Sequence, residues 1–152
     1  MSTMTAQTTQ VYSIFIRATP EQVWDAITKP EFTQKYFHGS VIESDYAPGS
    51  PYRGFAADGS VQYVDGEVLE ADPPRLLRTT WRAVWSPDLA EEPFSRVSWE
   101  IEPTGEGVTR LTVVHDDLER APKTAESVAS PDGWSFVVSG LKSVLETGEG
   151  LG

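Results

Sequence analysis

The sequence predicts an α+β domain in which a curved antiparallel sheet of six to seven strands wraps around one long C-terminal helix. Two observations indicate this class. Residues 134–148 carry apolar side chains at the i, i+3/i+4, i+7 spacing of a helix with one buried face. Almost everything before them alternates like short strands separated by turn residues, without the regular βαβ order of a parallel sheet. Ser130 is the expected N-cap of the long helix, Pro131 its first residue, and Gly148 its end.

The N-terminal part predicts one strand followed by two short helices. Residues 10–17 are rich in β-branched and aromatic side chains, which is typical of a strand. Thr19 then caps a helix with Pro20 at its first position, and Gln22 completes a capping box. Pro30 ends that helix and begins the second one.

The central part predicts hairpins of short strands. The expected strands are 41–45, 52–56, 61–70, 76–84, 96–102 and 109–116. In 61–70 the apolar residues do not keep one parity, and a bulge near Gly66 would reconcile them. We expect two loops, an acidic one at 86–95 that covers the mouth of a cavity and another at 118–130.

Composition limits the function classes. The chain of 152 residues is expected to form one domain over 9–149, after a disordered tail at 1–8. Its net charge of −11 disfavours nucleic acid and anionic membrane surfaces. The absence of cysteine excludes disulfides and thiol chemistry. Without a signal-like N-terminus or a long apolar run, a cytoplasmic location is the default expectation.

Several stretches carry a family resemblance: 18–24, 66–76, Trp81, Gly133 with Trp134, and 141–148. Their order resembles the helix-grip fold of the START and Bet v 1-like (SRPBCC) superfamily. Within it, the chain is similar to the bacterial branch related to the activator of Hsp90 ATPase. The resemblance implies a deep apolar cavity between the long helix and the sheet. Members of the superfamily bind lipids, polyketides, plant phenolics or hormones, some are cyclases or aromatases, and the activators contact a chaperone.

Aromatic and apolar side chains are the candidate ligand-binding residues, because an apolar or planar ligand needs such walls. The alternative is that they only fill the core. The candidates are Phe37, Phe55, Tyr63, Trp81, Trp85, Trp99, Val113, His115, Trp134, Val138 and Leu141.

His115 is the one weak catalytic candidate. It continues the inward parity of Leu111 and Val113, so its ring is expected to point toward the helix. It could orient a ligand, act as an acid or base, or be a structural histidine with satisfied hydrogen bonds. The histidines lack the spacing of a metal site, so neither a metal nor a cofactor is expected.

Three functions stay open at this point. The first is binding of a small hydrophobic or aromatic molecule. The second is a cyclase, aromatase or hydratase that uses the same cavity. The third is interaction with an Hsp90-type chaperone, which the acidic charge disfavours. A homodimer is possible.

Overall fold

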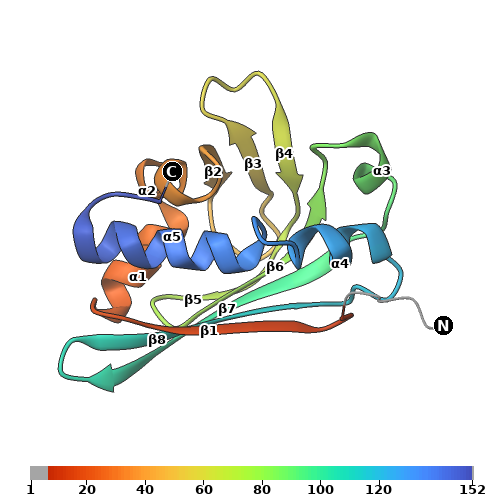
Figure 1. Cartoon of the computed structure of the whole chain (residues 1–152). Helices are drawn as coiled ribbons and strands as arrows, with labels where there is room; N and C mark the ends of the chain where they lie inside the picture. The colour runs from red at the N-terminus through yellow and green to blue at the C-terminus, as the bar shows by residue number, and fades with distance from the viewer. Residues whose placement is uncertain (1–6, 152) are drawn as a thin grey trace.

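One layer of strands curves around the long C-terminal helix in this computed structural model, which describes residues 7–151 (Figure 1). The helices are α1 (Pro20–Thr28), α2 (Pro30–Tyr36), α3 (Pro87–Ala90), α4 (Pro122–Val128) and α5 (Trp134–Thr147). The strands are β1 (Gln10–Ile16), β2 (Ser40–Ser44), β3 (Tyr52–Ala56), β4 (Gln62–Asp65), β5 (Val68–Asp72), β6 (Leu76–Ala83), β7 (Ser95–Gly105) and β8 (Val108–Asp116). The expected α+β class and helix-grip architecture are confirmed.

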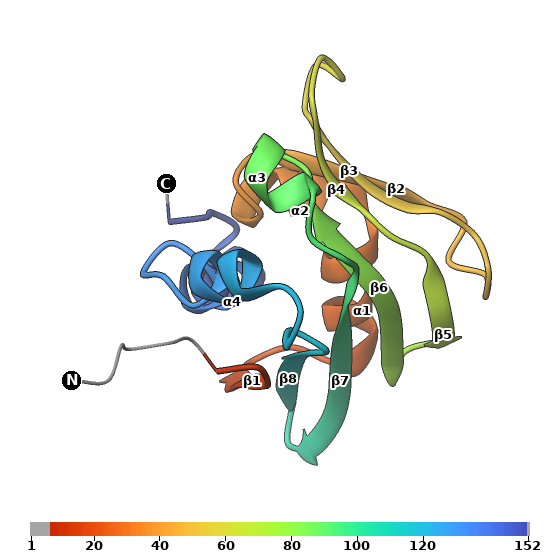
Figure 2. The same ribbon diagram turned by 90° about the vertical axis from the view of Figure 1, so that its right-hand side faces the viewer.

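The sheet is antiparallel, in the order β1-β8-β7-β6-β4-β3-β2, with β5 also paired to β6. Figure 2 shows that it bends around α5 and α4, with α1 and α2 in the same concavity. It has eight strands instead of six to seven, because the expected strand 61–70 is divided in two. The division lies at Gly66, where a Cβ would stand 2.1 Å from the carbonyl oxygen of Thr80. The parity conflict in the sequence therefore marks a break at Gly66, and the pairing of β5 with β6 also shifts its register between Val68 and Glu70, close to the expected bulge.

The capping box of α1 is confirmed. The Thr19 hydroxyl accepts from the backbone N–H of Gln22 at 3.2 Å, and the Gln22 side chain accepts from the Thr19 N–H at 2.8 Å. Both contacts are local, which is why the sequence predicted them.

The start of α5 was predicted wrongly. The helix begins at Trp134, with Gly133 as N-cap, while the hydroxyl oxygen of Ser130 lies 2.6 Å from the Ser127 carbonyl oxygen. Ser130 thus closes the helix before it, α4, which occupies the region expected to be a loop. Gly133 allows the tight connection, since a Cβ there would stand 2.1 Å from the Val128 carbonyl oxygen. The end at Gly148 is confirmed, with a left-handed φ of 88°.

The sequence analysis missed the short helices α3 and α4. For α4, the reason is that a residue distant in the sequence caps its N-terminus. Glu92, after α3, accepts from the backbone N–H groups of Lys123 (2.9 Å) and Thr124 (2.7 Å) at the start of α4. A carboxylate satisfies exposed amides at a helix N-terminus as a local cap does. The local sequence of α4 therefore could not predict this contact with Glu92.

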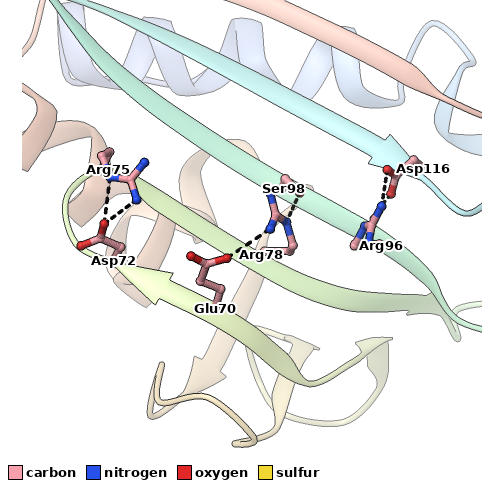
Figure 3. Close-up of polar contacts among 7 residues, drawn as sticks. All are labelled: Glu70, Asp72, Arg75, Arg78, Arg96, Ser98 and Asp116. Atoms are coloured by element: carbon pink, nitrogen blue, oxygen red, sulfur yellow. Dashed lines mark hydrogen bonds and ion pairs between the residues drawn. The ribbon is translucent and has the colours of Figure 1, made fainter.

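The two faces of the sheet differ in chemistry. Val97, Trp99 and Ile101 of β7 and Leu111 of β8 are buried toward α5, as predicted. The opposite face carries ion pairs across strands (Figure 3): Arg78 contacts Glu70 at 3.1 Å, and Arg96 contacts Asp116 at 2.7 Å. Burial therefore concentrates on the concave side, where α5 lies.

The N-terminal tail and the lengths of the helices bear on two expectations from the sequence. Residues 1–6 of the expected N-terminal tail lie outside the described residues. Within residues 7–151, every helix is too short or too polar to cross a membrane.

Candidate functional site

A cavity of about 370 Å³ lies between the α4–α5 region and the inner face of the sheet. Binding sites for small molecules commonly have volumes of this order. Residues of several elements line it. They come from the α2–β2 connection, β4, β6 and the segment after β6, α4 and α5. Its lining residues are Phe37, His38, Ser40, Tyr63, Val64, Trp81, Trp85, Ser127, Val128, Asp132, Gly133, Trp134 and Val137.

Aromatic rings in contact with one another form much of the wall. The Trp81 ring lies 6.0 Å from that of Trp85 and 6.3 Å from that of Trp134, measured between centroids. Phe37 meets Trp134 at 5.8 Å with the two ring planes at 71°. Edge-to-face pairs at such distances are favourable beyond the area that they bury. The rings come from β6, α5 and the end of α2, so tertiary folding assembles this wall.

Some predicted site residues meet at this cavity. Phe37, Tyr63, Trp81, Trp85 and Trp134 all line it. Trp81 and Trp134 are almost completely buried, while Trp85 remains 44% exposed.

Other predicted residues do not line the cavity. Trp99, Val113, Val138 and Leu141 are buried in the core instead. The reason for Trp99 is visible in the packing: the Trp134 ring stands 5.5 Å from it and fills the space against it. Large side chains thus occupy much of the expected space between helix and sheet.

Phe55 lies elsewhere. It lines a separate hollow beside β2 and β3, together with Ile42, Arg53 and other residues. Figure 1 shows the hairpin β3–β4 projecting away from α5. Along β3, Tyr52 and Gly54 are buried, whereas Phe55 shares the side of the exposed Arg53.

His115 is inward-facing as expected but does not line the cavity. It is fully buried, its ring 5.0 Å from that of Trp81 and 5.9 Å from that of Trp134. The indole N–H of Trp134 donates to Nδ1 of His115 at 2.9 Å, so Nδ1 carries no proton. The Ser95 hydroxyl donates to the Trp81 carbonyl at 3.0 Å and therefore accepts from Nε2–H of His115 at 2.7 Å.

These bonds hold His115 neutral. Burial lowers the pKa of His115 to about 3, against a smaller raising effect of Asp116. A ring with both nitrogens engaged and no access to the cavity cannot exchange a proton with a ligand near pH 7. Of the three roles considered for His115, this geometry corresponds to a structural histidine with satisfied hydrogen bonds.

The sequence analysis missed the side of the cavity formed by connections between elements. None of residues 86–95 is among the lining residues, whereas Ser127, Asp132, their neighbours and His38 are. Nε2 of His38 contacts the carbonyl oxygen of Asp132 at 2.8 Å, and its ring stacks on Phe136 at 5.7 Å. Residues of irregular connections lack periodicity, so only folding brings these two segments together.

Metal chemistry finds no support in the side-chain arrangement. Among residues 7–151, no three histidine, aspartate or glutamate side chains gather as a metal site would require.

Comparisons with known proteins agree with this fold. The family described as "Activator of Hsp90 ATPase homolog 1-like protein" matches residues 17–146. No curated protein matches the sequence.

Three solved structures are similar over most of their length. Protein MLL2253 from Mesorhizobium loti is 27% identical, with 91% of this chain and 96% of that chain covered and a TM-score of 0.68. The Aha1 dimer from Colwellia psychrerythraea is 20% identical (95% and 100% covered, TM-score 0.71). PFC0360w, an HSP90 activator from Plasmodium falciparum, is 21% identical (94% and 90% covered, TM-score 0.61).

The match spans most of the chain, in agreement with the helix-grip architecture. This chain belongs to the activator of Hsp90 ATPase homolog 1-like family of the SRPBCC superfamily.

Proposed function

We propose that the protein binds a small, largely aromatic molecule in the cavity walled by Phe37, Trp81, Trp85 and Trp134. The observation that carries this proposal is a cavity of about 370 Å³ whose walls are mainly rings from separate elements. An engineered apolar cavity of roughly 150 Å³ already holds benzene, so this one has room for about two or three fused rings.

The cavity is also partly preorganised. The Trp134 ring is fixed by its bond to His115, and Trp81 packs against both. A rigid wall reduces the entropy lost on binding.

The enzyme hypothesis receives less support. Its acid–base candidate, His115, is separated from the cavity and has a pKa of about 3. His115 therefore cannot serve as the acid–base group that a hydratase or cyclase needs near neutral pH.

The chaperone hypothesis also receives less support. On the solvent face of the sheet, arginines pair with carboxylates: Arg78 with Glu70, Arg82 with Asp65, and Arg96 with Asp116. Their charge is largely neutralised on a chain of net charge −11, so they do not form the basic surface that would steer an acidic partner. The homodimer expectation takes its support from the Colwellia structure, and light scattering after gel filtration tests it.

Calorimetric titration with methyl 2-naphthoate, a neutral two-ring probe, tests the proposal. Ser127→Phe places a ring in the cavity from α4 and should weaken binding at least tenfold. Ser135→Phe is the matched control, because Ser135 is exposed on α5 and outside the lining set.

Two results would contradict the proposal. One is no detectable heat or tryptophan quenching with this probe. The other is equal weakening by both phenylalanine variants, because the binding would then not occur in this cavity.

A further inference from the structure

The lining of the aromatic cavity includes an ionised carboxylate. Asp132 belongs to the lining set and is exposed, so it lies where the cavity meets solvent. The Ser130 hydroxyl, 2.7 Å from its Oδ1, is the main cause that lowers the pKa of this carboxyl, which is therefore ionised at neutral pH. Of the described residues that line the cavity, none is a lysine or an arginine.

His38 is the one basic side chain in the lining set. Its Nε2 contacts the carbonyl oxygen of Asp132 at 2.8 Å, and a carbonyl oxygen can only accept, so Nε2 carries a proton. A neutral imidazole with its proton on Nε2 satisfies this contact, so the contact requires no positive charge. At pH 8, where an imidazole is ordinarily uncharged, the lining then has a net charge of one carboxylate.

The segment next to the cavity adds to the negative potential. Trp85 lines the cavity, and residues 86–95 directly after it include Asp88, Glu91 and Glu92 but no lysine or arginine. Lys123 on α4 lies 3.9 Å from Asp88 and offsets one of these charges. On a chain of net charge −11, this potential attracts cations and repels anions.

The rings of the wall suit a cation as well. Trp81 meets Trp85 with the two ring planes at 72°, and Phe37 meets Trp134 at 71°. Rings at such angles form corners, where a bound group can lie over the face of one ring and beside another. A cation over an aromatic face is attracted by the ring, and Trp is the best partner. Trp85 is 44% exposed, so its ring is not fully covered by the protein.

From this arrangement we infer that the ligand is an organic cation, an aromatic molecule with a tertiary or quaternary ammonium group, which Asp132 attracts and the ring of Trp85 contacts. The inference rests on the proposed function and specifies the charge of the ligand. The buried rings of Trp81 and Trp134 then form the wall for its apolar part.

Two probes of nearly the same shape test the charge. They are the phenyltrimethylammonium cation and its uncharged carbon analogue tert-butylbenzene, titrated at pH 8 and followed by tryptophan quenching. We expect the cation to bind about fivefold tighter, since a cation–π contact at a partly exposed site is worth roughly that factor. The preference is informative because water solvates the cation far better, and burial of apolar surface alone would favour the hydrocarbon.

Two pairs of variants locate the preference. Asp132→Asn should reduce it at least twofold, whereas Glu100→Gln, an equal change of charge at an exposed position on β7, should retain it. Trp85→Leu should also reduce it at least twofold. Its control is Phe94→Leu, at an aromatic residue of similar exposure outside the lining set.

The failures are distinguishable. If the cation binds no tighter than the hydrocarbon, or if either variant changes the preference no more than its control, the inference is overturned. Binding of methyl 2-naphthoate would then still support the proposed function. If neither that ester nor either probe binds, the proposed function fails together with the inference.

Discussion

The indole Nε1 of Trp134 lies 2.9 Å from Nδ1 of His115, and this bond joins the first turn of α5 to the last residues of β8. It decides both the tautomer of His115 and the orientation of a ring in the cavity wall. A Trp donor and a neutral His acceptor are compatible only while the imidazole stays unprotonated at Nδ1.

The first prediction concerns stability against pH. Unfolded His115 takes up a proton as the pH falls through about 6.5, whereas the folded residue stays neutral down to about pH 3. The unfolded state therefore binds more protons in this window. The free energy of unfolding should fall by roughly 1 kcal/mol for each pH unit below 6.5 and be unaffected by this residue above it.

Urea unfolding at pH 7, 6 and 5 measures this dependence. His115→Gln should flatten it, and His38→Asn, which removes the other histidine of the chain, should leave it in place. An unchanged slope in His115→Gln would mean that another group causes the acid sensitivity.

The second prediction concerns Ser95, which links His115 to the backbone of β6. In Ser95→Ala, the buried Nε2–H of His115 loses its acceptor. We expect a loss of about 1–3 kcal/mol in the free energy of unfolding. Ser139→Ala, on the exposed side of α5, serves as the control and should stay within about 0.5 kcal/mol of the original chain. Equal stability of the two variants would refute the linking role.

The third prediction concerns the contact of Glu92 with the N-terminus of α4. Burial raises the pKa of Glu92, but hydrogen bonds from Thr124 and from the backbone of Lys123 and Thr124 outweigh it, so the pKa is lowered. The stabilisation is present above the ordinary carboxyl pKa and is lost as the pH falls through the lowered one. At pH 7, Glu92→Gln should cost about 1 kcal/mol of unfolding free energy.

Its neighbour provides the comparison. Glu91 is exposed, and Glu91→Gln makes the same change of charge one residue away. If thermal melts show equal effects for both, the cost reflects net charge and not the cap of α4.

The fourth prediction concerns the contact of His38 with the Asp132 carbonyl, which joins the two connections beside the cavity. His38 has a left-handed φ of 53°, so Asn is the suitable replacement. His38→Asn should accelerate amide hydrogen exchange in residues 127–133 several-fold. Asp117→Asn, at another left-handed position with φ of 58°, is the control. Unaltered exchange in the His38 variant would show that this contact does not restrain the segment.

Parity predicted which side chains point inward, whereas packing decided which of them line the cavity. Strand alternation correctly directed Trp81 and His115 inward. It could not tell that Trp134 would lie against Trp99 and separate His115 from the cavity, because rotamers and hydrogen bonds decide that. Nor could local patterns reveal that Glu92 would cap α4.

By itself the sequence determined the α+β class, the capping box of α1, the apolar face of α5 and its end at Gly148. These follow from hydrophobic periodicity and from contacts between residues a few positions apart. Tertiary structure alone decided the break at Gly66, the start of α5, and which aromatic rings surround open space instead of filling the core. Those features depend on close approach between distant segments, such as Gly66 against Thr80 and Gly133 against Val128, and on the volume that packed side chains leave unfilled.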